Sequence, residues 1–183
     1  MLTAAGLRFD VHPAEVDEIA LKQAARSENA DAATAALRLA DAKAAWVAPA
    51  EPGALVIGAD QILVCDGAWF DKPADLAAAR MQLRTLRGRA HVLATAVVCW
   101  RSGDRLWQHI AGPRLVMRRF SDTCLEAYLA LDGDRVLGSV GAYRLEGPGA
   151  HLFTRVEGEH AAILGLPLLP LLEFLRQSGV LLA

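Results

Sequence analysis

The sequence predicts an α/β protein in which a mixed sheet is flanked by helices. Strand-like apolar segments alternate with helix-like segments in the first half of the chain, and two further apolar segments follow each other across a short turn. In addition, 54% of the 183 residues are hydrophobic, and no linker long enough to separate independent domains occurs. We therefore expect a single domain over residues 1–183.

Three elements are predicted in the first 65 residues. A short strand is expected at 7–12, and the alanine-rich segment 30–47 predicts a helix that two prolines end. The apolar run 54–65 is typical of a buried strand and closes in an Asp-Gly turn.

The later elements are marked by their end signals. Pro73 stands at the start of a predicted helix and Gly88 at its exit, while Ser121 or Asp122 can cap another helix. Many glycines argue against a long regular element over 136–158. In chain order, the sequence predicts a helix at 73–87, an antiparallel pair at 91–100 and 105–119, a helix at 121–131, a short strand at 150–156 and a final helix at 167–177.

Composition excludes several classes of function. The 19 basic residues are offset by 21 acidic ones, so the net charge of −2 provides no overall attraction to nucleic acid or anionic lipid. The longest uncharged apolar runs are too short to cross a bilayer, and the first residues lack the pattern of a signal peptide. Cys65, Cys99 and Cys124 are far apart, as expected for reduced thiols. We therefore expect a cytoplasmic protein that binds neither nucleic acid nor membrane.

Several catalytic signatures are absent from the sequence. The five histidines include no pair at i, i+2 or i, i+4, which argues against a zinc site. The sequence also lacks the G-x-S-x-G elbow, the phosphate-binding P-loop and the G-x-G-x-x-G fingerprint. Neither an α/β-hydrolase nor a P-loop or dinucleotide-binding protein is therefore indicated.

Asp60 is a carboxylate inside an otherwise apolar strand. Burying a carboxylate without a partner is unfavourable, so Asp60 must be paired, bind a metal or lie at the mouth of a site. Gly58, two residues earlier, would let a ligand or another backbone come close to the strand. The alternative is an aspartate that only caps a strand end or a turn.

Two lysines are candidates for phosphate contacts. Lysine is scarce here, with three against sixteen arginines. Lys72 precedes a predicted helix start, where free N–H groups favour anions, and Lys43 is the only lysine in the alanine-rich helix. The alternative for both is an ordinary surface lysine.

Further carboxylates are candidates for metal or ligand binding. Asp17 and Glu18 form an acidic pair in a predicted turn, and such carboxylates can hold Mg²⁺. Glycines surround Glu146, which would let the backbone wrap closely around a planar ligand. A solvated turn is the alternative in both places.

Taken together and in order, these residues resemble the Maf family of nucleoside triphosphate pyrophosphatases. No single motif is highly specific, but the ordered series is, and it extends from residue 6 to about 175. The series consists of V-D-E at 16–18, Lys43, G-A-D-Q at 58–61, D-G at 66–67, K-P at 72–73, G-R-x-H at 88–91, G-A-Y-x-x-E-G at 141–147 and G-L-P-L at 165–168.

The resemblance implies a fold, a reaction and residue roles. It implies a Maf-like α/β fold with a cleft between two lobes, a homodimer, and hydrolysis of a nucleoside triphosphate to the monophosphate and pyrophosphate with a divalent cation, Mg²⁺ or Mn²⁺. Asp60 becomes the general base that activates water, and Glu18 becomes its partner in binding the metal or the water. Lys43 and Lys72 become the triphosphate contacts.

Two residues indicate the subgroup of the family. Members that act on dTTP and UTP resemble G-A-D-T with a glutamine before the later glycine, whereas this chain has Gln61 and Glu146, as in the subgroup that resembles 7-methyl-GTP pyrophosphatases. A carboxylate can accept hydrogen bonds from guanine N1–H and its exocyclic amine. We therefore expect a modified purine triphosphate, with dTTP or UTP as the alternative.

One family motif has no counterpart in the sequence. Family members usually carry L-A-S-x-S-x-R-R ahead of the segment that corresponds to 2–7, and the printed sequence contains no such motif. In the family, the serines and arginines of that loop would bind phosphate groups. The second hypothesis is therefore a Maf-like protein that binds nucleotides with weak or no catalysis.

Overall fold

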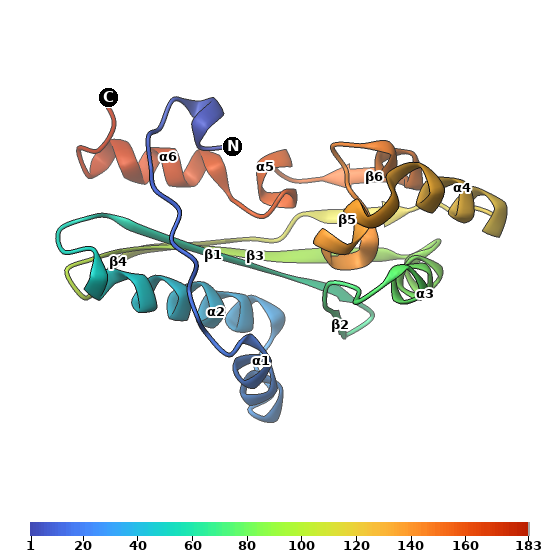
Figure 1. The fold of residues 1–183 in the computed structure, drawn as a ribbon, viewed down its shortest axis with the longest axis horizontal. Coiled ribbons are helices and arrows are strands. Elements are labelled where there is room, and N and C mark those ends of the chain that lie inside the picture. The colour runs from blue at the N-terminus through green and yellow to red at the C-terminus, as the bar shows by residue number, and fades with distance from the viewer. Residues whose placement is uncertain (183) are drawn as a thin grey trace. The chain divides into compact units, whose positions relative to one another are not determined.

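The computed structural model describes residues 1–182, and that part of the chain contains six strands and six α-helices (Figure 1). No helix in this part is both long and apolar enough to span a membrane. The chain divides into two compact units. Unit 1 comprises residues 1–61, 94–112 and those from 159 on, and unit 2 comprises 62–93 and 113–158.

The strands form one sheet in the order β2-β1-β3-β5-β6, and β4 also pairs with β3. The pairings β1–β2, β3–β4, β3–β5 and β5–β6 are antiparallel. The predicted fold class, a sheet flanked by helices in an α/β chain, is confirmed. The strands are β1 (Val56–Cys65), β2 (Ala68–Phe70), β3 (Ala90–Arg101), β4 (Asp104–Ala111), β5 (Arg114–Met117) and β6 (Phe153–Glu157).

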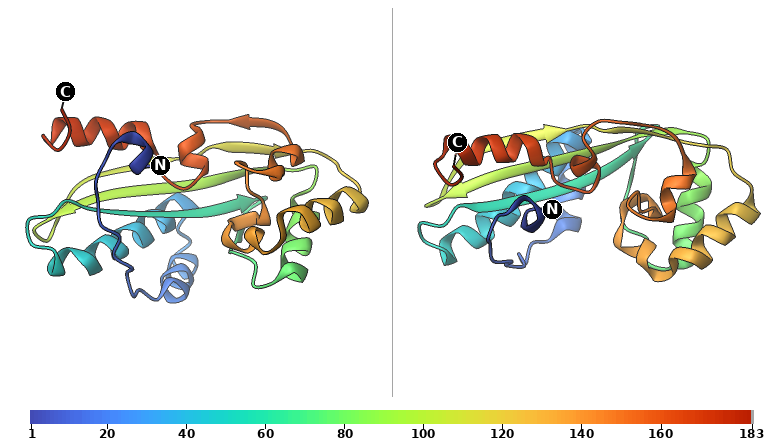
Figure 2. Two further views of the ribbon diagram at one scale, coloured as in Figure 1. Left: turned by 45° about the horizontal axis from the view of Figure 1, so that its top comes forward. Right: turned by 90° about the horizontal axis from the view of Figure 1, so that it is seen from above.

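Unit 1 has helices on both faces of its strands. Figures 1 and 2 show α2 (Ala32–Val47) on one face and α6 (Leu168–Gln177) on the other. Residues of β3 alternate between the two layers: Cys99 packs in one cluster with Leu171 of α6, while the Trp100 indole donates to Asp41 of α2. The remaining helices of this unit are α1 (Glu18–Ser27) and α5 (His160–Ile163).

Close packing of α2 on β1 depends on Gly58. A Cβ at this position would lie 2.3 Å from the Ala40 carbonyl oxygen and 2.9 Å from the Ala44 Cβ. The small side chains of α2 and the glycine on β1 therefore let the two backbones approach closely. The glycine accommodates the helix backbone, which is one of the two roles that the sequence left open.

Unit 2 combines two helices with a series of short turns. The helices are α3 (Leu76–Leu86) and α4 (Asp122–Asp132), and the segment 133–152 contains three 3₁₀ helices instead of a long regular element, as expected from its glycines. Gly141 lies inside the unit: a Cβ there would lie 2.6 Å from Leu63 Cδ1 and 2.8 Å from Tyr143 Cε1.

The structure differs from the predicted elements at several places. Residues 7–12 form no strand and are mostly exposed. Helix α1 was not predicted, because only its first residues were interpreted, as an acidic turn. Strand β2 and helix α5 were not predicted either. The predicted strand 105–119 is two strands, β4 and β5, because Pro113 lacks the N–H that a continuous ladder requires.

We expect Gly58→Ala to destabilise the protein by about 2 kcal/mol and to lower Tm by roughly 5 °C, because the new Cβ would overlap the α2 backbone. Gly138→Ala is the matched control, since a Cβ there meets no atom within 4 Å. Thermal unfolding of both variants at one pH checks this. Equal Tm values for the two variants would contradict the packing argument.

His91 should make stability depend on pH. The His91 Nε2 lies 2.8 Å from the Tyr143 hydroxyl, and burial lowers the pKa of His91 from 6.5 to about 4. As the pH falls, His91 of the unfolded chain becomes protonated before His91 of the folded protein does, which favours unfolding. The folded protein therefore has its full stability above about pH 6.5 and loses about 3 kcal/mol of it as the pH falls toward 4.

Urea denaturation between pH 7.5 and 4 measures this effect as a difference. The stability advantage of the wild type over His91→Gln should shrink by about 3 kcal/mol across that range, since glutamine does not titrate. The exposed His151 provides the control: His151→Gln should follow the wild-type curve. A constant difference between wild type and His91→Gln would contradict the assignment.

Candidate active site

The Lys43 ammonium lies between two carboxylates in unit 1. Its Nζ is 2.6 Å from Asp60 Oδ1 and 2.7 Å from Glu18 Oε1. Asp60 is nearly buried, with 9% of its side chain exposed, whereas 44% of the Glu18 side chain is exposed. The three residues come from β1, α2 and α1, so two helices and a strand together build the cluster.

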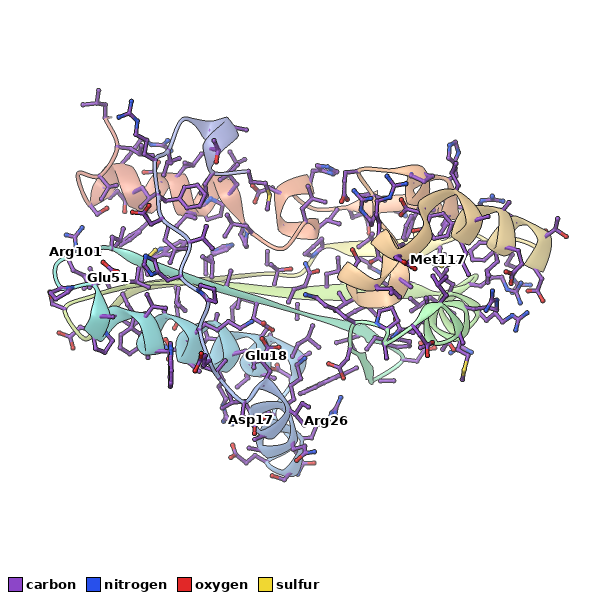
Figure 3. All side chains as sticks on the ribbon, viewed as in Figure 1. Asp17, Glu18, Arg26, Glu51, Arg101 and Met117 are labelled. Carbon is purple, nitrogen blue, oxygen red and sulfur yellow. The ribbon has the colours of Figure 1, made fainter. Side chains whose placement is uncertain are left out.

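Local structure explains why these side chains meet. Asp17 is the N-cap of α1, where its carboxylate accepts a hydrogen bond of 2.9 Å from the Ala20 N–H, and Glu18 is therefore the first residue of a helix. Figure 3 shows Glu18 at the start of α1, where this helix meets α2. The expectation that Asp17 and Glu18 lie in a turn was wrong, because the capping interaction begins a helix there.

Burial and pairing shift the pKa values within this cluster. Burial is the largest influence on Asp60 and raises the pKa of its carboxyl, although the hydrogen bond and charge of Lys43 act in the opposite direction. Burial alone would lower the pKa of Lys43, but the hydrogen bonds to Asp60 and Glu18 outweigh it and raise that pKa. Lys43 is therefore a cation at neutral pH, and Asp60 is more basic than an ordinary aspartate.

The two carboxylates are of a chemical type that divalent cations bind, and the Lys43 ammonium occupies the point where one oxygen of each meets. Their oxygens converge on one positive centre at hydrogen-bond distance, and carboxylate oxygens are ligands that Mg²⁺ and Mn²⁺ prefer. Residues 1–182 hold no group of three or more His, Cys, Asp and Glu side chains that could bind a metal. The remaining ligands would have to be water and phosphate oxygens, which is the usual pattern for Mg²⁺ at nucleotide sites.

Gln61 lies on the other face of the sheet from Asp60. Its Nε2 donates to Thr95 Oγ1 at 2.7 Å and to the carbonyl oxygens of Ala162 and Ile163 at 3.0 and 3.2 Å. A carbonyl oxygen can only accept a hydrogen bond, so the Gln61 atom that faces the two carbonyls must be the nitrogen Nε2. The Oε1 atom of Gln61 therefore remains as an acceptor. The structure thus does not bring the Gln61 side chain into the cluster, and its amide instead ties β1 to α5.

Lys72 belongs to unit 2 and is exposed. It lies between β2 and α3, four residues before the helix, which begins at Leu76 after the N-cap Asp75 and not at Pro73 as predicted. The preceding residue is fixed from within the unit, because the Gln82 amide donates to the Asp71 carbonyl at 2.8 Å.

Glu146 also belongs to unit 2, between two 3₁₀ turns. Arg144 Nε donates to Glu146 Oε1 at 3.1 Å. The neighbouring Gly149 is required by the fold of the chain itself, since a Cβ there would lie 2.5 Å from the Arg144 carbonyl oxygen. The glycines therefore have a packing role whether or not a planar ligand binds.

Three residues near the predicted positions were missed in the sequence. Lys22 lowers the pKa of Asp60 through its charge. Lys22 follows Glu18 by four residues, so a prediction of α1 would have placed the two side chains on the same face of the helix. Thr95 supports Gln61 from the next strand, and Arg144 binds Glu146. No local pattern singles out Thr95, since the contact joins residues 34 positions apart.

Comparison with known proteins gives a consistent result. The family model described as "Maf-like protein" matches residues 1–178. Three curated proteins named nucleoside triphosphate pyrophosphatase are similar to almost the whole chain. They come from Granulibacter bethesdensis (55% identity, covering 99% of this chain and 92% of the relative), Paramagnetospirillum magneticum (51%, 99% and 93%) and Rhodospirillum rubrum (50%, 100% and 91%).

Removing the lysine from the cluster should destabilise the fold. We expect Lys43→Met to reduce the free energy of unfolding by about 2 kcal/mol, because it leaves the nearly buried Asp60 carboxylate unpaired. The double variant Lys43→Met/Asp60→Asn should lose clearly less than the sum of the two single losses.

Arg38→Met is the control for this cycle. Arg38 is also on α2, but its ion pair with Glu28 is exposed on both sides, so the change should cost no more than about 0.5 kcal/mol. Urea denaturation of all variants provides the measurement. Strict additivity of Lys43→Met and Asp60→Asn would show that the two residues do not interact.

Proposed function

The chain belongs to the Maf family, and on that premise we propose that it is a nucleoside triphosphate pyrophosphatase. In this reaction the phosphoanhydride between the α- and β-phosphates is hydrolysed to a nucleoside monophosphate and pyrophosphate. The observation that carries the proposal is the cluster in which Asp60 and Glu18 converge on the Lys43 ammonium. We propose further that the whole chain acts as one Maf-like domain in the cytoplasm.

Asp60 is proposed as the general base. Attack on the α-phosphorus requires a water that loses a proton as it bonds to phosphorus, and the carboxylate can accept that proton. Burial makes Asp60 more basic than an exposed aspartate and fixes it at one point of β1. Both properties support this role.

Lys43 and Lys72 are proposed to bind the triphosphate. Lys43 lies at hydrogen-bond distance from Asp60, so a phosphate oxygen that pairs with this ammonium would come within about two hydrogen-bond lengths of the base. Lys72 is exposed, and the backbone beside it is held by Gln82. Its ammonium is therefore open to an anionic ligand from solvent.

Glu18 and Asp60 are proposed to hold the divalent cation, Mg²⁺ or Mn²⁺. When bound, the cation would supply neutralisation of the charge on the phosphate oxygens. The same two carboxylates repel a triphosphate in the absence of cations, and Lys43 reduces that repulsion.

We favour 7-methyl-GTP as the substrate over dTTP and UTP. Glu146 is an acceptor, and Gln61 can act on a base only through Oε1 because its nitrogen is fully used. Guanine presents adjacent N–H donors at N1 and at the exocyclic amine, whereas a pyrimidine such as uracil presents one N–H between two carbonyls. An acceptor-only group such as the Glu146 carboxylate suits the guanine edge better.

Pyrophosphate release from 7-methyl-GTP, GTP, dTTP and UTP, with Mg²⁺ or Mn²⁺, tests the proposal. We expect the highest kcat/KM for 7-methyl-GTP, and Asp60→Asn should lower kcat by roughly 10²- to 10⁴-fold, because asparagine cannot accept the proton. Asp104→Asn, an exposed aspartate at the start of β4, should retain activity.

Two results would contradict the proposal in different ways. Nucleotide binding with no release that depends on Asp60 would exclude the catalytic role and leave a nucleotide-binding protein. Highest turnover of dTTP or UTP would retain the pyrophosphatase but reject the assignment of the base.

A further inference from the structure

Unit 2 contains a fully buried carboxylate outside the candidate active site. Asp132, the last residue of α4, has 0% of its side chain exposed. Its Oδ1 lies 3.1 Å from Arg135 Nη2 and 3.3 Å from Arg144 Nη1, and its Oδ2 lies 3.3 Å from the Tyr128 hydroxyl. A buried carboxylate requires such partners, so this position is specified by several groups at once.

Arg144 connects this buried carboxylate to an exposed one. Its Nη1 binds Asp132, while its Nε donates to Glu146 Oε1 at 3.1 Å. The exposed fraction of the side chain rises along the series, from 0% for Asp132 to 24% for Arg144 and 43% for Glu146. Because the guanidinium of Arg144 is planar and is held by the buried Asp132, it also fixes the orientation of the exposed Glu146 carboxylate.

The backbone that carries Glu146 is held at several points. Gly141 and Ala142 have φ values of +80° and +59°, and the second of these is unusual for a residue with a side chain. The Tyr128 hydroxyl lies 3.2 Å from the Ala142 carbonyl, so its proton is shared between that oxygen and Asp132. Arg144 also packs its backbone against Gly149. Strained backbone of this kind persists only where the surroundings fix it.

We propose that Asp132 and Arg144 are positioning residues that preset the Glu146 carboxylate for recognition of the nucleotide base. This inference rests on the proposed function. Arg144 holds Glu146 Oε1 and leaves Oε2 to accept from a ligand. The ligand class is a base with adjacent imino and amino N–H donors, as on the guanine edge.

Preorganisation, rather than added stability, is the function of this arrangement. An exposed ion pair such as Arg144 with Glu146 contributes little to folding. A free glutamate, however, must lose rotamer freedom when it binds a ligand, and a glutamate already held by Arg144 has lost most of it. The expected effect is therefore on affinity and selectivity for the base, and not on the chemical step.

The test compares kcat and KM of the full-length protein for 7-methyl-GTP and UTP. Arg144→Lys keeps the charge but cannot bridge the two carboxylates with separate nitrogens, so KM for 7-methyl-GTP should rise roughly fivefold to tenfold with kcat within about twofold. KM for UTP should be unchanged. Asp132→Asn should act in the same direction.

Two comparisons complete the experiment. Glu146→Gln alone should reduce the preference for 7-methyl-GTP, and adding Arg144→Lys should reduce it no further, because both act through one carboxylate. Asp134→Asn, an exposed aspartate two residues from Asp132, should behave as wild type. If Asp132→Asn fails to fold, Arg144→Lys and the double variant still give the answer.

The failures are distinguishable. If Glu146→Gln changes base preference while Arg144→Lys and Asp132→Asn do not, the positioning role is wrong and the proposed base contact stands. If Glu146→Gln leaves the preference unchanged, the base contact itself is wrong and the positioning role falls with it. Equal losses for both substrates in Arg144→Lys would indicate a purely structural role and overturn the inference.

Discussion

The close approach of α2 to β1 at Gly58 determines the rest of unit 1. Because Gly58 has no side chain between the two backbones, Lys43 on α2 reaches the carboxylate of Asp60, which lies two residues after Gly58 on β1. Helix α1 then completes the cluster, since its first residue supplies the second carboxylate. A wider separation of the layers would leave Asp60 buried without a partner, which is the arrangement that folding disfavours most.

The elements that could be predicted from the sequence are those with a strong local pattern. The alanine-rich helix, the apolar strand β1 and the glycine-rich segment of unit 2 were confirmed, and Asp60 was recognised because it interrupts an apolar run. Helix α1 was missed, although Asp17 is a favourable N-cap residue. The membership in the Maf family that the ordered motifs suggested was also confirmed.

Other parts of the site could not be predicted, because they depend on contacts between distant residues. The direction of Gln61 follows from strand alternation, but its partners on β3 and α5 do not, since they are 34 to 102 positions away. Arg144 occupies the first x of the motif G-A-Y-x-x-E-G, a position at which the motif specifies no residue type. Its hydrogen bond to Asp132 joins residues 12 positions apart. The contacts of Gln61 and Arg144 are thus set by the tertiary structure and not by a local sequence pattern.

The hydrogen bonds of Gln61 tie its side chain to the fold of unit 1. Its amide nitrogen is shared among Thr95 and two carbonyl oxygens of unit 1, so replacing Gln61 would remove hydrogen bonds that join β1 to β3 and α5. Glu146, by contrast, is partly exposed and rests on a support that other residues provide. If Glu146 contacts the base as proposed, substitutions at position 146 would change the base preference at a smaller cost in folding than substitutions of Gln61.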